Sequence, residues 1–284
     1  MSSLRDLVAA ELAEPVDPRV AALAAAIAAE HGDSSRTVLF YGSCLREKQL
    51  DGLMLDFYLV VSDYRAAYDK HWMATANRLL PPNVFPFHHR ELAAKYAVLS
   101  EDDFNRLNGP ATRNVSIWAR FAQPSRLVWA KNELAKALAV DAVAKAAPTL
   151  LGAAGRQAGE ELLDWWRRAF ALTYSAELRA ERKGRSQSVV ESDPERYRRF
   201  GEAAAPEIGS NAGQWDRRRV EGKLLSVLRL AKASASYAGG AEYIAWKINR
   251  HAGTDFQLSP WQKRHPLLAA ISLLPRLLRS GAIR

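Results

Sequence analysis

The residues of this chain best suited to chemistry are a Gly-Ser turn and one aspartate that follows it. The apolar run 37–41 ends at Gly42-Ser43, and a second apolar run, 54–61, carries Asp56. A glycine lets the backbone approach a ligand closely, so that backbone N–H groups and the serine hydroxyl can hold phosphate oxygens. A carboxylate on the next strand can anchor a Mg²⁺ ion that bridges those phosphates. The spacing therefore predicts a site for a triphosphate and its metal ion.

Both motifs also have a structural explanation. A Gly-Ser pair after a strand is most often only a turn, and an aspartate in a strand is often an edge residue or the partner of an arginine. A buried carboxylate among Leu55, Phe57 and Leu59 nevertheless requires a partner. The order and spacing of the two motifs together favour the functional interpretation.

The pattern of apolar residues predicts the elements that must position these motifs. Residues 4–30 are Ala-rich and should be helical, with a break near Pro15 and Pro18, and the runs on either side of the turn should be strands. Further short strands are expected at 84–87, 96–99 and 115–121. Further helices are expected at 64–80, 101–107, 131–158, 160–183, 215–235 and 240–252.

Strands that alternate with helices, followed by helices alone, predict an α+β fold. The first domain is expected over residues 1–140 and carries the Gly-Ser turn and Asp56. A mostly helical domain that contributes to the site should follow over 141–255, and a basic amphipathic tail over 256–284.

The tail combines aromatic, basic and aliphatic residues. Trp261, Lys263 and Arg264 precede a leucine-rich segment that would form one apolar helical face, with Arg276 and Arg279 away from it. This composition is typical of a segment that lies in a membrane interface with its cations over anionic headgroups. A terminal helix docked on the protein's own core is an equally common alternative.

The amino-acid composition excludes several classes of protein. Of the 284 residues, 48% are hydrophobic, which excludes a disordered chain, and 25% are charged, which excludes an integral membrane protein. The net charge of +9 favours an anionic partner such as a nucleotide, a nucleic acid or an acidic lipid surface. One cysteine, Cys44, permits no internal disulfide and suits a reducing cytoplasm. Together with the tail, this predicts a cytoplasmic protein associated peripherally with the inner face of the membrane.

Motifs spread over residues 37–180 occur together in one known family. The chain contains Tyr41-Gly-Ser43, Met54-Leu-Asp-Phe57, Lys95-Tyr-Ala-Val98, a run from Asn114 through Arg120 to Pro124, and Leu172-Thr-Tyr-Ser-Ala-Glu-Leu-Arg179. In this order they resemble motifs of the mitochondrial-type phosphatidate cytidylyltransferases, the translocator assembly and maintenance family. Members of that family make CDP-diacylglycerol from CTP and phosphatidic acid. The chain is similar to a divergent, prokaryote-like member.

The chain departs from the family pattern at several positions. Cys44 replaces the second glycine of the turn, Gln123 stands where the family has lysine, and Glu177 where it has aspartate. Tyr58 fills the position at which most polymerase-beta-type enzymes place a second metal carboxylate, and this family lacks that carboxylate too. Another acid must then complete the metal site. Asp51 and Glu177 are the candidates, and an ordinary salt bridge is the alternative role for Glu177.

The resemblance implies a polymerase-beta-like nucleotidyltransferase fold, with a mixed sheet, and a role for each matched residue. Catalytic roles fall to Asp56, Lys95, Glu177 and Arg179. Nucleotide binding falls to Gly42, Ser43, Asn114 and Arg120. The Mg²⁺ cofactor would be held by Asp56 and Glu177. The implied partners are CTP, phosphatidic acid and an anionic membrane surface, and the sequence does not predict the oligomeric state.

In the implied reaction, a phosphate oxygen of phosphatidic acid attacks the α-phosphorus of CTP, and pyrophosphate leaves. The attacking group is already anionic, so catalysis depends on alignment and on neutralising the triphosphate rather than on a strong base. Two other functions fit the same residues. One is nucleotidyl transfer to RNA, a protein or a small molecule, and the other is non-catalytic nucleic-acid binding through the basic cluster 215–219. No recognised nucleic-acid-binding motif accompanies that cluster, which disfavours nucleic acid as a partner.

Overall fold

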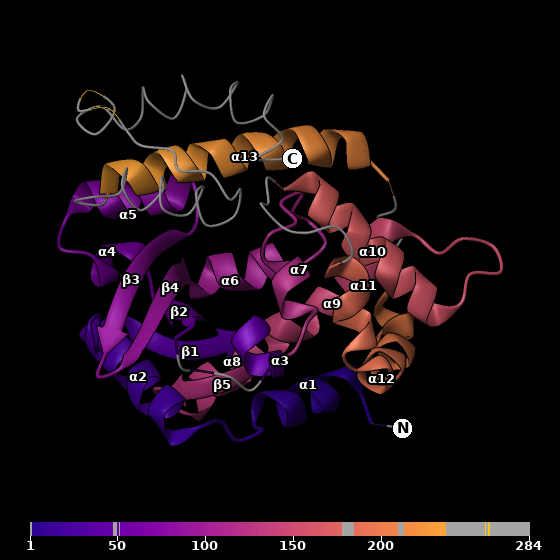
Figure 1. Cartoon of the computed structure of the whole chain (residues 1–284), viewed down its shortest axis with the longest axis horizontal. Coiled ribbons are helices and arrows are strands. Elements are labelled where there is room, and N and C mark those ends of the chain that lie inside the picture. The colour runs from indigo at the N-terminus through magenta and orange to yellow at the C-terminus, as the bar shows by residue number, and fades with distance from the viewer. Residues whose placement is uncertain are drawn as a thin grey trace.

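A mixed sheet packed between helices lies at the centre of the molecule (Figure 1). The computed structural model describes residues 2–47, 50, 52–177, 185–209, 213–236, 259 and 261. Within these residues the sheet has five strands and the α+β class predicted from the sequence is confirmed. Arg179, Asp51, the segment 240–252 and the tail, apart from Ser259 and Trp261, lie outside the described residues.

The sheet has the strand order β3-β4-β2-β1-β5. β2 and β4 run parallel, and the other neighbouring pairs are antiparallel. The strands are β1 (Ser35–Tyr41), β2 (Met54–Val61), β3 (Asn83–His89), β4 (Leu92–Ser100) and β5 (Ser125–Ala130). The chain passes from β1 through the short helix α3 (Ser43–Glu47) before it enters β2. The Gly-Ser turn therefore lies at the carboxyl end of β1, beside the first half of β2.

Helices cover both faces of this sheet. The helices before β3 are α1 (Leu4–Leu12), α2 (Pro18–Ala29), the 3₁₀ turn η1 (Gly32–Ser34), α4 (Tyr64–Ala67) and α5 (His71–Leu79). Those between β4 and residue 177 are α6 (Glu101–Asn108), α7 (Trp118–Phe121), α8 (Glu133–Ala144), α9 (Ala146–Ala154) and α10 (Leu162–Ala176). The last are α11 (Arg185–Glu191), α12 (Pro194–Ala204), the 3₁₀ turn η2 (Ala205–Glu207) and α13 (Trp215–Ser236).

The first two helices begin at residues whose side chains cap them. The Ser3 hydroxyl accepts a hydrogen bond from the backbone N–H of Asp6, and the Asp6 carboxylate accepts one from the backbone N–H of Ser3. Asp17 caps α2, whose first residue is Pro18, where a missing N–H is no loss. Pro15 lies between the two helices, so the predicted break is confirmed.

The alternation of side chains along β2 sorts them onto two faces of the sheet. Leu55 and Phe57 pack into a hydrophobic cluster with residues of α2, α4 and α5. Tyr58 and Val60 pack into a larger cluster with residues of α1, α6, α7, α9 and α10. Asp56 is in phase with Tyr58, so its carboxylate lies on the face of the larger cluster.

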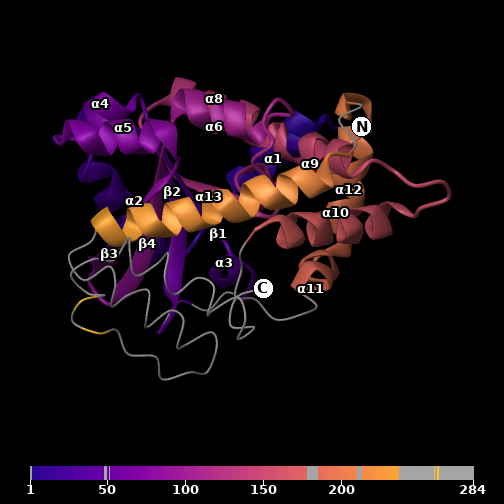
Figure 2. The same ribbon diagram turned by 90° about the horizontal axis from the view of Figure 1, so that it is seen from above.

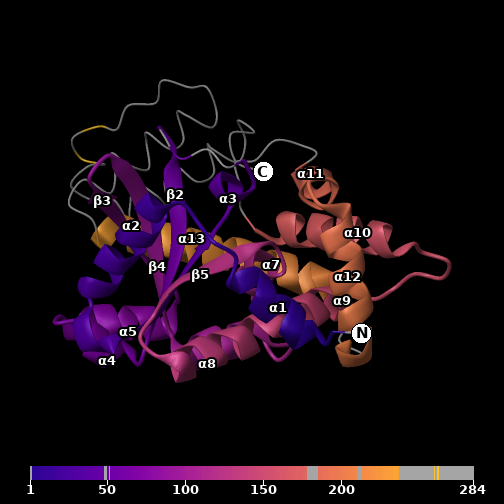
Figure 3. The same ribbon diagram turned by 90° about the horizontal axis from the view of Figure 1, so that it is seen from below.

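The larger cluster extends from α1 to Ala204 at the end of α12 and contains residues on both sides of residue 140. Glu11 of α1 and Arg196 of α12 form a buried ion pair, in which Nη2 donates to Oε1 at 2.9 Å. Figure 3 shows α1 beside α12, although the sequence separates them widely. The expected boundary at residue 140 falls inside α8, and residues on both sides of it share one core. The division into domains stays a prediction.

One expected strand is wrong. The segment 115–121 ends in the helical turn α7, and the fifth strand begins only at Ser125. Ile117, Trp118 and Phe121 are buried in the larger cluster. A short apolar run of this kind does not distinguish a buried strand from a buried helical turn. The helix expected over 64–80 is confirmed in outline, but it is divided into α4 and α5.

Within the part of the chain that the structure describes, one helical stretch is long and apolar enough to cross a membrane. This stretch, Glu133–Ala154, comprises α8 and α9, and 67% of its apolar window is buried inside the protein. Ala139, Val143 and Leu150 belong to the larger hydrophobic cluster. The stretch therefore has the packing of a core element.

Candidate active site

Gly42 adopts a backbone conformation that its position against Asp56 requires. Its φ of +100° is one that residues with a side chain rarely adopt, and a Cβ there would lie 3.1 Å from Asp56 Oδ2. The preceding residue, Tyr41, pairs with Asp56 in the antiparallel register of β1 and β2. The predicted juxtaposition of the Gly-Ser turn and the aspartate is therefore present, with the turn in contact with the carboxylate. Ser43 follows as the first residue of α3.

Lys95 is the cationic partner of Asp56. The two residues face each other in the parallel register of β4 and β2, and Lys95 Nζ lies 3.0 Å from Asp56 Oδ1. Their side chains retain 34% and 22% of their exposure, although Asp56 Oδ1 itself is buried and its contact with Lys95 is an ion pair rather than a hydrogen bond. The ion pair is the structural role that the sequence left open for Asp56. It also places a carboxylate, which can hold a metal ion, and an ammonium, which can bind a phosphate oxygen, side by side at the turn.

The aromatic rings of Tyr41 and Tyr58 pack against each other beside Asp56. Their rings lie 5.1 Å apart, and Phe121 of α7 lies 5.2 Å from the Tyr58 ring. Burial raises the pKa of Tyr41 well above its usual value, and the negative charge of Asp56 raises it further. Burial also raises the pKa of Tyr58. Both hydroxyls are therefore neutral at physiological pH, and neither adds negative charge to the site.

A second polar cluster surrounds Glu177, directly after α10. The buried Ser116 donates a hydrogen bond to Glu177 Oε1, and Arg120 Nη1 lies 3.6 Å from the same oxygen. Arg120 also donates to the backbone carbonyl of Ser116. Asn114 supports this arrangement, because its Oδ1 accepts a hydrogen bond from the backbone N–H of Ser116 at 3.1 Å. The predicted residues Asn114, Arg120 and Glu177 are thus brought together.

Arg120 connects this cluster to the aspartate. Burial alone lowers its pKa, but electrostatic interactions with the Tyr58 and Tyr41 hydroxyls and with the carboxylates Glu177 and Asp56 outweigh burial and raise the pKa well above its usual value. The positive charge of Arg120 also acts on Tyr41, the strand partner of Asp56, and partly offsets the rise in the pKa of that tyrosine. The charged guanidinium of Arg120 therefore pairs with Glu177 and also interacts electrostatically with Asp56, the other predicted metal ligand.

Arg229 of α13 was not among the residues predicted from the sequence. Its Nε donates to the carbonyl of Pro81 at 2.8 Å, and its Nη1 donates to Ser116 Oγ at 2.8 Å. The only local signal is a basic residue within the apolar stretch 224–231. Such a residue on a helix usually faces solvent, so the sequence could not assign it to the site.

The donor set fits a Mg²⁺ site with one protein carboxylate better than a closed protein cage. Among the described residues, no group of three or more His, Cys, Asp or Glu side chains is placed to hold a metal ion. Mg²⁺ is often held by only one or two carboxylates together with substrate phosphates and water, and Asp56 at the turn suits that mode. Glu177 Oε1 is already engaged by Ser116 and Arg120. A metal-ligand role for Glu177 stays a prediction. Its contacts favour a different role, in which Glu177 holds the Arg120 side chain in place.

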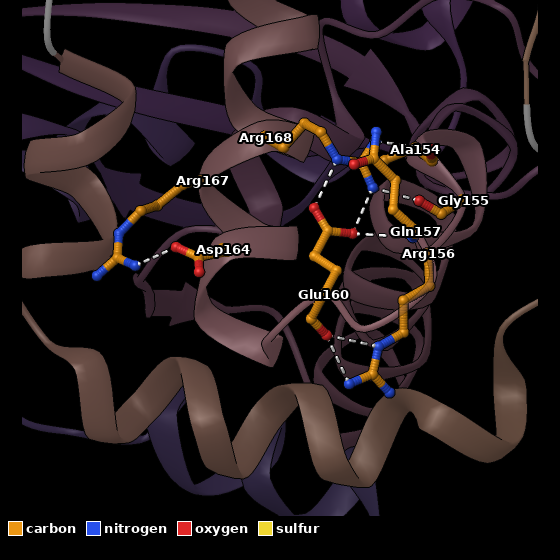
Figure 4. A network of polar contacts seen from close by, with 8 residues as sticks. All are labelled: Ala154, Gly155, Arg156, Gln157, Glu160, Asp164, Arg167 and Arg168. Carbon is orange, nitrogen blue, oxygen red and sulfur yellow. Dashed lines mark hydrogen bonds and ion pairs between the residues drawn. The ribbon is translucent and has the colours of Figure 1, made fainter.

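The network around Glu160 in Figure 4 is structural. Arg168 Nε donates to Glu160 Oε1 and Nη2 to Oε2, each at 2.6 Å. Arg168 Nη1 donates to the carbonyl of Ala154 at 3.0 Å, and Nη2 donates to that of Gly155. These carbonyls end α9 and have no partner within that helix. The network therefore closes the end of α9 and fastens it to α10.

The basic cluster 215–219 is largely engaged within the protein. Arg217 pairs with Glu221 at 2.8 Å, and Arg219 pairs with Asp216 at 2.8 Å. Arg218 is buried and donates to the backbone carbonyls that precede Asn114. These contacts weaken the alternative in which the cluster binds nucleic acid.

The chain matches no protein-family model, and a search of curated proteins finds no relative. Assignment of a function therefore depends on the geometry of the site and on the resemblance of its motifs.

Proposed function

We propose that this protein is a Mg²⁺-dependent nucleotidyltransferase that transfers CMP from CTP to phosphatidic acid, giving CDP-diacylglycerol and pyrophosphate. The observation that carries the proposal is the contact between the left-handed Gly42 and Asp56, with Lys95 3.0 Å from the carboxylate. A turn that only reversed the chain would not need a carboxylate and an ammonium directly beside it. The polymerase-beta-like character of the fold is part of this proposal.

Each residue at the turn has a part in holding the triphosphate. The backbone at Gly42 and Ser43 offers N–H groups, and the Ser43 hydroxyl adds a further donor. Asp56 would hold the metal ion, which would supply positive charge to neutralise the phosphates. Lys95, released from part of its interaction with Asp56, neutralises a further phosphate oxygen.

The reaction needs no strong base. An anionic oxygen of the acceptor phosphate forms a bond to the α-phosphorus of CTP, while the bond to the pyrophosphate oxygen breaks and pyrophosphate carries away the charge. Arg120, whose charge interacts with Asp56 and Tyr41, would stabilise charge on the reacting phosphates. Glu177 and Ser116 hold Arg120 in place for this.

A lipid acceptor is supported by the outer face of α13. Val220, Leu224 and Leu228 are spaced by one helical turn and are 69%, 56% and 44% exposed. Lys223 is exposed near them on the same helix, and Arg217 is exposed there in its pair with Glu221. An apolar stripe flanked by cations suits the interface of an anionic membrane. Since the inner side of α13 supplies Arg229, such a contact would bring the site to a lipid headgroup.

An assay of pyrophosphate release tests the proposal. Purified protein should release pyrophosphate from CTP only when Mg²⁺ and phosphatidic acid vesicles are both present, and labelled CDP-diacylglycerol should form in equal amount. ATP, GTP and UTP should be poorer donors, as the family resemblance implies. Release with an RNA or protein acceptor but not with lipid would identify the alternative acceptor class. No release with any nucleotide and acceptor would contradict the proposal.

A further inference from the structure

α13 is fixed against the site by close backbone packing. A Cβ added at Gly222 would lie 2.1 Å from the carbonyl oxygen of Ala176, the last residue of α10. Only glycine allows the two helices to approach so closely, and Glu177 follows directly. Arg218 fixes the first turn, because its Nη1 donates to the carbonyls of Thr112 and Arg113 at 3.2 and 3.1 Å. Figure 2 shows α13 running across the strands of the sheet from above.

This packing places Arg229 at the same serine as Arg120. Arg229 Nη1 donates to Ser116 Oγ at 2.8 Å, and Arg120 donates to the carbonyl of Ser116. The Ser116 hydroxyl in turn donates a hydrogen bond to Glu177. Two guanidiniums from α7 and α13 therefore converge on one residue, although they are far apart in the sequence.

Among the described residues, this cluster holds the cations Arg120, Arg229 and Lys232 and one carboxylate, Glu177, whose charge partly offsets the effect of burial on Arg229. Glu177 is 3.6 Å from Arg120, but no carboxylate in the described residues forms an ion pair with Arg229. Lys232, one turn further along α13, donates to the carbonyl of Pro82 at 3.0 Å and adds another cation. Burial lowers the pKa of Arg229, and burial lowers that of Lys232 to about 7 with the charge of Arg229 contributing. Buried positive charge of this kind is costly without an anion, and a bound anion would relieve it.

We propose that Arg229 and Arg120, joined by Ser116, form the binding site for the phosphate monoester of the acceptor. A guanidinium offers several N–H donors in a planar fork that matches phosphate oxygens, which suits it to this ligand better than an ammonium. The inference rests on the proposed function for its assignment to the acceptor. The binding of a phosphate monoester at these residues can be measured independently of turnover.

The position of the cluster distinguishes it from the triphosphate site. The triphosphate is assigned to Gly42, Ser43 and Lys95 at the carboxyl end of β1. Arg229 is tied instead to Ser116 and to the carbonyl of Pro81, which precedes β3. Arg120 interacts with both regions, because Asp56 and Glu177 each contribute to its raised pKa. A phosphate held by Arg229 would thus lie beside the triphosphate and not among the groups at the Gly-Ser turn that bind it.

The experiment compares Arg229→Gln with Arg198→Gln, a control on α12 whose side chain is 53% exposed in its pair with Glu195. Binding of dihexanoyl phosphatidic acid and of Mg²⁺-CTP is measured separately by isothermal titration calorimetry. Arg229→Gln should weaken binding of the lipid by at least about tenfold and leave CTP binding nearly unchanged. In the assay of turnover, the KM for the lipid should rise by a similar factor. Arg198→Gln should change neither binding constant.

Several outcomes would overturn the proposal. Unchanged lipid binding in folded Arg229→Gln would show that Arg229 only connects α13 to the loop at Pro81 and does not bind the acceptor. Loss of CTP binding instead would assign the cluster to the triphosphate. If circular dichroism shows that Arg229→Gln is unfolded, Arg229→Lys decides, because it keeps the charge but loses the fork and should still weaken lipid binding. Lipid binding that depends on Arg229 in a protein without turnover would support the site and contradict only the proposed function.

Discussion

A Cβ at Gly42 would lie 3.1 Å from Oδ2 of Asp56, so the Gly-Ser turn and the strand carboxylate are in contact. The turn follows β1 and the carboxylate lies on β2, and the antiparallel pairing of Tyr41 with Asp56 brings them together. This contact makes the backbone at Gly42 and the side chain of Asp56 parts of one site. It also explains why the turn needs a glycine there.

Gly42→Ala should therefore damage both stability and the site. The positive φ alone costs about 1–3 kcal/mol of unfolding free energy for a residue with a side chain. Gly213→Ala is a matched control, because Gly213 has φ +102° and a Cβ there would meet nothing within 4 Å. Urea unfolding should show similar or smaller destabilisation for the control. Only Gly42→Ala should lose CTP binding, and equal CTP binding by both variants would contradict the assignment of the turn.

The sequence predicted the two motifs because strand alternation and turn chemistry are local. Lys95 was placed correctly among apolar residues of a strand, and its parallel register with Asp56 fixes it beside the carboxylate. The turn α7 was missed because Trp118 and Phe121 make a short apolar run without clear periodicity. Arg229 was missed because its role depends on packing between α13 and α10, which no local pattern records.

Glu177→Gln tests which of two roles this residue has. Glutamine preserves the shape and an acceptor for Ser116 but removes the charge opposite Arg120. If Glu177 holds Arg120, the KM for phosphatidic acid should rise, while the Mg²⁺ concentration for half-maximal rate stays within about twofold. A large rise in the Mg²⁺ requirement would make Glu177 a metal ligand, as the sequence first suggested. Thermal unfolding serves to exclude a global loss of structure.

The apolar stripe of α13 should contribute to membrane binding. The double change Leu224→Glu and Leu228→Glu removes apolar contact and adds repulsion from anionic headgroups. Sedimentation with vesicles that contain phosphatidic acid should weaken by at least about tenfold. Leu134→Glu on α8 is the control, since Leu134 is 69% exposed and lies outside the stripe. Equal sedimentation of the double variant and the wild type would remove this support for a lipid acceptor.

The Glu160–Arg168 contact should make stability depend on pH. Hydrogen bonds from Arg168 hold the pKa of Glu160 below its ordinary value of 4.5, so the folded state favours the charged carboxylate. Its contribution is full above that ordinary value and is lost as the pH falls toward the lowered pKa. The difference in unfolding free energy between wild type and Glu160→Gln should therefore be largest near neutral pH and shrink in acid. Glu195→Gln is the control, because Glu195 is 68% exposed in its pair with Arg198, and it should give little difference at any pH.

The most direct measurement of the central claim is pyrophosphate release from CTP by Asp56→Asn with Mg²⁺ and phosphatidic acid. Asparagine keeps the size of the side chain but cannot anchor a divalent cation as a carboxylate does, so turnover should fall by at least about 100-fold with the fold intact. Asp141→Asn, which disrupts only an exposed pair with Arg5, should retain wild-type turnover. Near-wild-type release by folded Asp56→Asn would show that Asp56 serves only its ion pair with Lys95, and the proposed active site would be wrong.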